Sequence, residues 1–166
     1  VGHLESRGAS SLYQPARSTD FRFRTQAPPR SYRSSAAVRD LVQAKNDGLD
    51  VWVAIVDARS PANYTGTDPG QGIARGGHIP GAVNVFCNDT LLDTEKPVLR
   101  PANQLRQLYT QSNLQPNQPV ITYCRTGGQG SLSYFVLKYL GYDVRLYDGS
   151  FSEWSQIEDN PVSQDR

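Results

Sequence analysis

Methionine is absent from this sequence of 166 residues, and cysteine occurs only twice. Without methionine there is no initiator residue, so we expect the chain to be a processed piece or a fragment of a longer protein. Two cysteines are too few for a disulfide scaffold, which excludes the class of small domains held together by several bridges. A single bridge between Cys87 and Cys124 is the one disulfide that stays open.

Long hydrophobic runs are also absent. The longest unbroken apolar run, Val51 to Val56, is far shorter than the roughly 20 residues that a membrane-spanning helix needs. The first residues contain no apolar region of the kind found in signal peptides. Hydrophobic residues make up 37% of the chain, which is enough for one core. We therefore expect one domain with no membrane partner and a cytoplasmic location, with the periplasm as the alternative.

The net charge of +1 conceals an uneven distribution. Residues 1–35 carry six arginines against Glu5 and Asp20, so the rest of the chain is slightly acidic. These arginines are spaced among Ser, Pro and Gln rather than clustered, which is not typical of a nucleic-acid-binding arm. We interpret residues 1–35 as an extended basic linker that contacts an acidic protein surface, and we expect no nucleic acid as partner.

Strand-like and helix-like segments alternate after this linker. Short β-branched or apolar runs predict strands over residues 51–58, 82–86, 120–123 and 144–147. Apolar spacing predicts helices over residues 36–44, 60–64, 100–111, 132–140 and 150–157. Ser34 or Ser35 is expected to cap the first of these helices, and Ser60 the second. This alternation predicts that residues 36–166 form one α/β domain with a mainly parallel central sheet flanked by helices.

Some side chains of these elements are expected in the core. In the helix predicted from residue 132, one face carries apolar residues at helical spacing, and Gly141 ends the helix. The members of that face are Leu132, Phe135, Val136, Tyr139 and Leu140. Trp52 and Trp154 are expected to pack in the core or under a lid.

The segment around Cys124 carries the chemistry. The apolar run Val120–Tyr123 ends at this cysteine, and a glycine-rich loop separates it from the next predicted helix. In parallel sheets, ligands bind beyond the carboxyl ends of the strands. Loop N–H groups and the helix N-terminus favour an anion there, and they favour a thiolate over a thiol. The sequence therefore predicts an activated cysteine in an anion-binding loop.

Three other segments accompany the cysteine loop, namely Val56-Asp57-Ala58-Arg59, Gly76-Gly77-His78-Ile79-Pro80-Gly81-Ala82 and Tyr147-Asp148-Gly149-Ser150-Phe151-Ser152-Glu153-Trp154. In this order and spacing, the four segments resemble the rhodanese (sulfurtransferase) family over roughly residues 36–162. Tyr64-Thr65-Gly66 and the long glycine-rich insertion before His78 resemble the C-terminal catalytic domain of a tandem two-domain sulfurtransferase. That resemblance implies an N-terminal rhodanese domain as a missing half or a separate chain, and a stand-alone domain with a tail is the alternative.

The resemblance implies a reaction and a site. Cys124 would attack the outer sulfur of thiosulfate and become a persulfide, and cyanide or a thiol would then take the sulfur. Donor binding is expected from two guanidinium groups, and persulfide binding from the loop N–H groups. The substrate-binding residues implied are Arg59, Arg125, Thr126, Gly127, Gly128 and Gln129. No cofactor and no metal are expected, because no metal-ligand spacing, phosphate-binding loop or dinucleotide motif is present.

Several alternatives stay open. Arg125 is typical of thiosulfate-type loops, but Thr126 stands where that type has a lysine, which predicts weaker thiosulfate binding. A 3-mercaptopyruvate sulfurtransferase, a sulfur carrier and a regulatory rhodanese module are the alternative functions. A cysteine phosphatase is excluded because Gly130 stands where its arginine is needed. Arg59 has a structural salt bridge, with Asp57 or with another residue, as its alternative role. We expect His78 to be structural, and Cys87 to be buried and inert rather than a resolving thiol.

Overall fold

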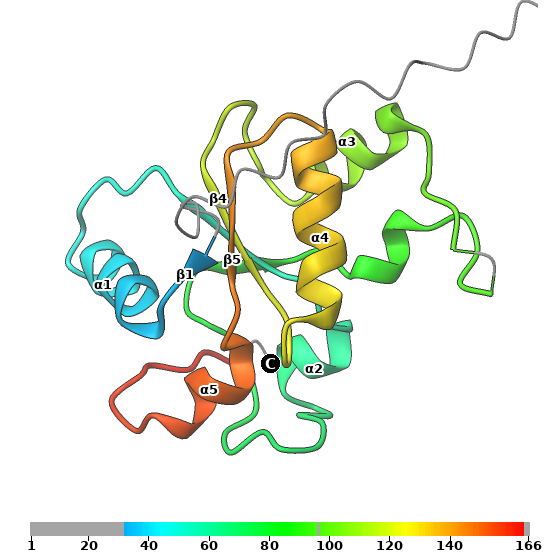
Figure 1. Cartoon of the computed structure of the whole chain (residues 1–166). Helices are drawn as coiled ribbons and strands as arrows, with labels where there is room; N and C mark the ends of the chain where they lie inside the picture. The colour runs from blue at the N-terminus through cyan, green and yellow to red at the C-terminus, as the bar shows by residue number, and fades with distance from the viewer. Residues whose placement is uncertain (1–31, 96, 165–166) are drawn as a thin grey trace, which may run out of the picture.

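In the computed structural model, which describes residues 32–95 and 97–164, five parallel strands form one sheet in the order β1-β5-β4-β2-β3 (Figure 1). The strands are β1 (Tyr32–Arg33), β2 (Ala54–Asp57), β3 (Ala82–Asn84), β4 (Val120–Tyr123) and β5 (Val144–Tyr147). Every strand that follows another along the chain is reached by a crossover, as parallel pairing requires. The predicted α/β fold with a parallel sheet is therefore confirmed.

Helices cover both faces of this sheet (Figure 1). They are α1 (Ser35–Asn46), α2 (Pro61–Thr65), α3 (Ala102–Gln111), α4 (Gly128–Tyr139) and α5 (Ser150–Gln156), with a short 3₁₀ helix, η1 (Cys87–Thr90). The predicted caps are confirmed: Ser34 accepts a hydrogen bond from the Ala37 N–H, and Ser60 does so from the Asn63 N–H. Gly141 follows α4 with a positive φ of 92°.

Successive side chains of β4 divide between two cores. Val120 packs with Leu105 of α3 and Val136 of α4 on one face of the sheet. Ile121 packs with Val38 of α1 and Trp154 of α5 on the other face. This alternation follows from the period of two along a strand. Because all four residues of β4 are buried, the segment reads in sequence as a continuous apolar run.

The N-terminal boundary of the domain lies earlier than the predicted residue 36. Tyr32 pairs with Leu146 and Arg33 with Tyr147, so the last residues of the supposed linker form the edge strand β1. The rest of the predicted basic arm, residues 1–31, lies outside the described residues. A strand of two residues leaves no periodicity in the sequence, which is why the pattern could not reveal it.

The first core strand is shorter than predicted. It begins at Ala54 rather than Val51, because its partner β4 begins at Val120, directly opposite Ala54. The residue before Val120 is Pro119, whose carbonyl accepts the Ala54 N–H at 2.9 Å but which has no N–H of its own to extend the ladder. Residues 51–53 therefore lack the pairing that would make them part of β2.

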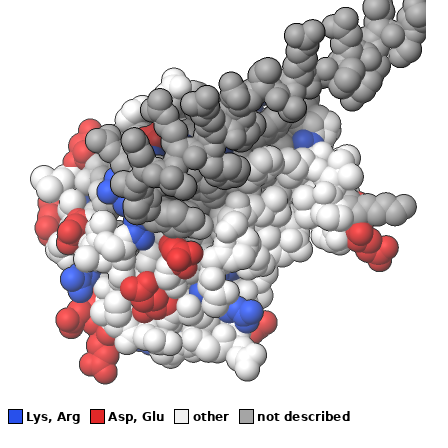
Figure 2. Space-filling model, viewed as in Figure 1, with Lys and Arg blue, Asp and Glu red and all other residues white. Residues whose placement is uncertain are grey.

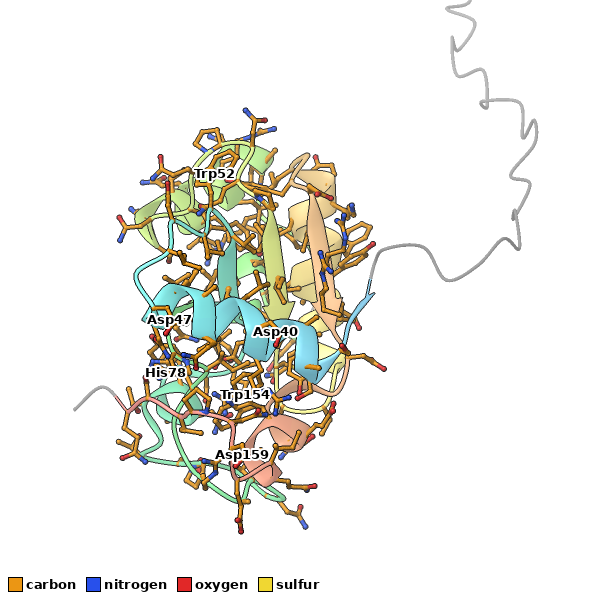
Figure 3. The ribbon with its side chains drawn as sticks, turned by 90° about the vertical axis from the view of Figure 1, so that its left-hand side faces the viewer. Asp40, Asp47, Trp52, His78, Trp154 and Asp159 are labelled. Atoms are coloured by element: carbon orange, nitrogen blue, oxygen red, sulfur yellow. The ribbon has the colours of Figure 1, made fainter. Side chains whose placement is uncertain are left out.

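The predicted inward face of α4 is wrong in part. Phe135 and Tyr139 are 57% and 59% exposed, whereas Gly130, Ser133 and Leu137 are buried. The helix packs on the sheet through small residues near its start, and such residues do not register in an apolar pattern. Trp52 is also 55% exposed. Figure 3 places it at the opposite end of the sheet from the fully buried Trp154.

The surface shows no single-sign face in the view drawn. Figure 2 shows acidic and basic side chains intermixed over the lower part of the molecule in the orientation of Figure 1. Among the described helices, none combines the length and the apolar character that crossing a membrane requires.

Candidate active site

The carboxyl ends of the sheet strands bring the motif segments together. Cys124 follows β4 directly, and Ala58 follows the neighbouring β2, with its N–H donated to the Tyr123 carbonyl at 2.9 Å. Ser150 begins α5 three residues after β5. In Figure 1, α2, α5 and the N-terminal end of α4 surround this lower edge of the sheet. This is the edge at which parallel sheets bind ligands.

The sulfur of Cys124 lies beneath its loop. The residue is 1% exposed, and the backbone N–H of Gly127 donates to Sγ at 3.0 Å. Gly127 is the residue before α4, so the positive end of that helix faces the sulfur. A main-chain donor and a helix N-terminus together stabilise negative charge on an atom held in this position.

The first turn of α5 holds the loop from outside. The N–H groups of Phe151 and Ser152 donate to the carbonyls of Cys124 and Arg125, at 2.9 and 3.0 Å. In a trans peptide unit the N–H points opposite to the carbonyl, so the next two N–H groups, of Arg125 and Thr126, are turned away from α5. The loop is therefore fixed in one orientation by hydrogen bonds that the sequence pattern did not reveal.

Ser150 contacts Cys124, and the sequence pattern did not reveal this contact. Its Oγ accepts the N–H of Cys124 at 3.3 Å and lies 4.0 Å from the sulfur, while its hydroxyl donates to the Tyr147 carbonyl at 3.0 Å. Its φ of 54° is unusual for a residue with a side chain, and such strain often marks a functional site. The turn Asp148-Gly149-Ser150, directly after a predicted strand, was the available signal.

Gly130 allows α4 to approach the sheet closely. A Cβ atom at this position would lie 3.0 Å from Cδ1 of Leu146 and 3.4 Å from the carbonyl carbon of Tyr123. A methyl group at this position would therefore be tightly packed, and the Leu146 side chain would have to shift to make room for it. The glycine thus keeps the helix N-terminus next to the cysteine loop.

Arg59 lies in a buried ion pair. Its Nη2 is 2.6 Å from Oδ2 of Asp57 and donates to the carbonyl of Gly77 at 2.7 Å. The guanidinium carbon also lies 4.0 Å from the ring centre of Phe151. Burial alone would lower the pKa of Arg59, but the hydrogen bond and charge of Asp57 outweigh this and raise it. The structure thus shows a structural ion pair, which was the alternative role for Arg59. Contact of Arg59 with substrate stays a prediction.

The remaining predicted binding residues lie in the loop after Cys124 and at the start of α4. Arg125, Thr126 and Gly128 are exposed, Gln129 is half-buried and Gly127 is buried. The Arg125 side chain lies against the glycine-rich segment before β3, since a Cβ at Gly70 would be 3.8 Å from its Nη1. One exposed guanidinium therefore stands beside the loop that covers the sulfur. Binding of substrate by these residues stays a prediction.

Cys87 and His78 are both buried. Cys87 packs with Ala58 and Cys124 in one small cluster, and both cysteines are free, so the Cys87–Cys124 bridge is not formed. Burial, and then the charge of an ionised Cys124, raise the pKa of Cys87 to about 11. His78 stacks on Tyr64 with ring centres 3.8 Å apart, and its backbone N–H donates to the Ser163 carbonyl, which agrees with a structural role.

The fold and the site define a class of protein, an α/β domain that holds a buried cysteine sulfur beneath a helix N-terminus at the carboxyl edge of its sheet. Residues 37–157 match the family described as Rhodanese-like domain, which is most of the chain. The chain belongs to this family. The predicted family resemblance is therefore confirmed, while the resemblance to a tandem protein's C-terminal half stays a prediction.

Curated relatives carry sulfurtransferase names. The thiosulfate sulfurtransferase of Pseudomonas aeruginosa is 35% identical over 128 residues, covering 76% of this chain and 45% of the relative. The thiosulfate/3-mercaptopyruvate sulfurtransferase 1, mitochondrial, of Arabidopsis thaliana is 32% identical over 160 residues, covering 95% and 40%. The sulfur carrier protein TtuD of Thermus thermophilus is 37% identical over 119 residues, covering 67% and 41%. The chain thus spans less than half the length of these three relatives.

Solved structures share the fold. The Tum1 protein from Saccharomyces cerevisiae is 26% identical with a TM-score of 0.69, over 82% of this chain and 47% of that one. The anaerobic ergothioneine biosynthesis enzyme from Chlorobium limicola gives a TM-score of 0.71 over 83% of this chain and 33% of that one. At 24% identity, the second likeness concerns the fold alone.

Proposed function

We propose that this chain is a sulfurtransferase that moves sulfane sulfur from thiosulfate to cyanide or a thiol through a persulfide on Cys124. The observation that carries the proposal is the Cys124 sulfur, held under the N-terminus of α4 with the Gly127 N–H at 3.0 Å. The sulfurtransferase names of the relatives support it.

In the first step, the Cys124 thiolate attacks the outer sulfur of thiosulfate. A new sulfur–sulfur bond forms, the sulfur–sulfur bond of the donor breaks, and sulfite leaves with the electron pair. The outer sulfur of thiosulfate is a single terminal atom, which is small enough to reach the buried Cys124 sulfur. Arg125 beside the loop supplies a permanent positive charge and paired donors for the sulfonate oxygens.

In the second step, cyanide or a thiolate attacks the outer sulfur of the persulfide, and the Cys124 thiolate leaves. The Gly127 N–H, which donates to the Cys124 sulfur before the reaction, also stabilises this leaving thiolate. Nothing in the step needs a proton shuttle when the acceptor is already an anion. The reaction is therefore a double displacement with a covalent intermediate.

Two alternatives have specific support. The relative from Arabidopsis thaliana is named for both thiosulfate and 3-mercaptopyruvate, which keeps the second donor open. The relative from Thermus thermophilus is named a sulfur carrier, which favours a protein acceptor for the persulfide. Because the chain spans less than half of these relatives, we also propose that a second rhodanese domain, in the same protein or a separate chain, completes the enzyme.

Steady-state transfer to cyanide, measured side by side with thiosulfate and 3-mercaptopyruvate, tests this function. We expect a larger kcat/KM with thiosulfate and no transfer by Cys124→Ser. A larger kcat/KM with 3-mercaptopyruvate would show that 3-mercaptopyruvate is the preferred donor. A persulfide that forms without turnover to cyanide would favour the carrier role, and no persulfide from either donor would overturn the proposal.

A further inference from the structure

A cavity of about 150 Å³ lies at the amino-terminal edge of the sheet. Ala54 begins β2, Gly81 directly precedes β3 and Gln118 precedes β4, and all three residues line this cavity. Because these strands are parallel, their amino-terminal ends meet at one edge of the sheet and their carboxyl ends at the other. The cavity is therefore at the opposite edge from Cys124 and is distinct from the site described above.

The walls of the cavity are mostly apolar and are incompletely covered. Val51, Val53 and Val83 are half-buried, and Leu114 is buried. A half-buried apolar wall keeps part of its surface in water, and covering that surface with an apolar group is favourable. The described side chains thus leave both room and apolar surface for a small ligand.

Of the described side chains that line the cavity, one is charged, and it is a cation. Lys45 lies in the last turn of α1 and is half-buried, and its Cδ is 3.9 Å from the place of a Cβ atom at Gly81. Burial lowers the pKa of Lys45, and no carboxylate of the described residues offsets that effect. The ion pairs within the described part of the chain do not involve this residue. Lys45 therefore brings a positive charge to the cavity without a counter-ion from the described residues.

An amide donor accompanies this cation. Gln118 is half-buried, and its Oε1 accepts the backbone N–H of Gln115 at 3.1 Å. Because that bond occupies the amide oxygen, the NH2 group of the same side chain is left to donate. The Gln115 side chain in turn donates to the carbonyl of Asn113 at 3.3 Å, which holds the turn that carries Gln118. An ammonium group and an amide N–H together suit a ligand that accepts hydrogen bonds and carries negative charge.

We propose that this cavity binds a small organic monocarboxylate with a short apolar tail. The carboxylate pairs with Lys45 and accepts a hydrogen bond from the Gln118 amide, and the tail covers the valine walls. A single positive charge matches a monoanion, whereas a dianion such as thiosulfate would keep an unpaired charge beside apolar walls. A volume of about 150 Å³ holds a molecule the size of benzene, and butyrate is of similar size. The site is separate from sulfur transfer and does not rest on it.

Titration with butyrate, followed by tryptophan fluorescence and by calorimetry, tests the proposal. Trp52 lies between two lining residues in the sequence and is 55% exposed, whereas Trp154 is fully buried at the opposite end of the sheet (Figure 3). We expect a saturable change in Trp52 fluorescence with a Kd of about 1 mM, which a ligand of this size can reach. Butyramide, which has the same shape without the charge, should bind about tenfold more weakly. Acetate should also bind about tenfold more weakly, because two buried CH2 groups are lost.

Variants of the cation locate the bound carboxylate. Lys45→Gln should weaken butyrate binding about tenfold, and Lys45→Arg, which keeps the charge, should retain most of the affinity. Lys138→Gln removes the same charge from an exposed position on α4 and is the matched control. Trp52→Phe should lose the fluorescence change and keep the heat of binding, which shows that the signal comes from this end of the sheet.

Four results would each overturn the proposal. The first is the absence of saturable butyrate binding, and the second is equal affinity for butyrate and butyramide. The third is an equal loss of affinity in Lys45→Gln and Lys138→Gln. The fourth is a loss of affinity in Arg125→Ala, which would place the carboxylate beside the cysteine loop instead. Because the readout is binding and needs no sulfur donor, failure here leaves the sulfurtransferase proposal unaffected.

Discussion

At the scale of single residues, the environment of Cys124 is built from the main chain more than from charged side chains. The Gly127 N–H donates to its sulfur, and the first-turn N–H groups of α5 hold the loop carbonyls. Arg125 is exposed beside this arrangement rather than part of it. We therefore expect loop architecture to control the reactivity of the sulfur and Arg125 to control donor binding.

Replacement of Arg125 by alanine tests that division. We expect the KM for thiosulfate to rise about tenfold with a small change in kcat, because a charged hydrogen bond contributes about 1.5–3 kcal/mol. The free energy of unfolding should stay unchanged, since the side chain is exposed. Arg106→Ala on α3 removes the same charge from another exposed position and is the control. An equal rise in KM for both variants would contradict a local role for Arg125.

The buried thiol of Cys87 predicts a stability change at alkaline pH. Its pKa in the folded chain is about 11 against an ordinary 9.0, so the folded state keeps a proton that the unfolded chain releases. Stability from this group is complete below pH 9 and is lost as the pH rises toward 11. The loss amounts to at most about 3 kcal/mol.

Urea unfolding at pH 8 and pH 10 measures this effect. We expect the wild-type free energy of unfolding to fall more steeply between these values than that of Cys87→Ala. Burial also raises the pKa values of Tyr109 and Tyr147 to about 12, which adds a fall of the same sign to both proteins. Only the smaller part of the Tyr109 shift, which comes from the charge of Cys87, differs between them. Parallel falls in the two proteins would show that Cys87 keeps no proton on folding.

At the scale of elements, α4 shows what a sequence pattern can and cannot reveal. Its C-terminal end at Gly141 was predicted, because glycine there has a known conformational reason. Its start was not, since residues 128–131 are Gly-Gln-Gly-Ser and carry no apolar signal. These residues form the first turn for a tertiary reason, namely that Gly130 fits against the end of β4. Close packing of small residues is visible only in three dimensions.

Substitution of Gly130 by alanine tests this contact. We expect Gly130→Ala to be less stable than Gly128→Ala by about 1 kcal/mol, because the added methyl group lies 3.0 Å from Cδ1 of Leu146, which must shift to make room. Gly128→Ala is the matched control, since a Cβ there meets nothing within 4 Å and the residue lies in the same turn. Denaturant unfolding of both variants makes the comparison. A stable Gly130→Ala protein would mean that α4 can shift outward without loss.

At the scale of the whole molecule, the Asp57–Arg59 pair joins segments that are distant in sequence. It connects the end of β2 to the Gly77 carbonyl and to the Phe151 ring of α5. Residues from both sides of the site thus depend on one buried charge pair. The sequence showed the Asp-x-Arg pattern, but no periodicity could say whether its guanidinium faces a ligand or the interior.

Replacement of Asp57 by asparagine should therefore be costly. We expect a loss of about 3–5 kcal/mol in the free energy of unfolding, because the Arg59 charge would stay buried without its partner. Asp143→Asn breaks the surface pair with Arg145, where Asp143 is 56% exposed, and should cost less than about 1 kcal/mol. Equal losses in the two variants would show that the buried pair stabilises the fold no more than the surface pair does.

The order of elements and the site loop were predictable because their signals are local. Strand runs, caps at Ser34 and Ser60, and the loop after Val120–Tyr123 each lie within a few residues of sequence. Edge strand β1, the positive φ of Ser150 and the exposure of Trp52 depend on contacts with distant segments. The features that the sequence could not predict are therefore those set by tertiary contacts, including the hydrogen bonds from α5 that orient the loop.

The central claim is that Cys124 carries the transferred sulfur, and the mass of the intact chain after incubation with thiosulfate tests it most directly. We expect a gain of one sulfur atom, about 32 Da, that cyanide removes and that Cys124→Ser does not acquire. The added sulfur should map to the peptide that contains Cys124. A gain that persists in Cys124→Ser, or that maps to Cys87, would contradict the account.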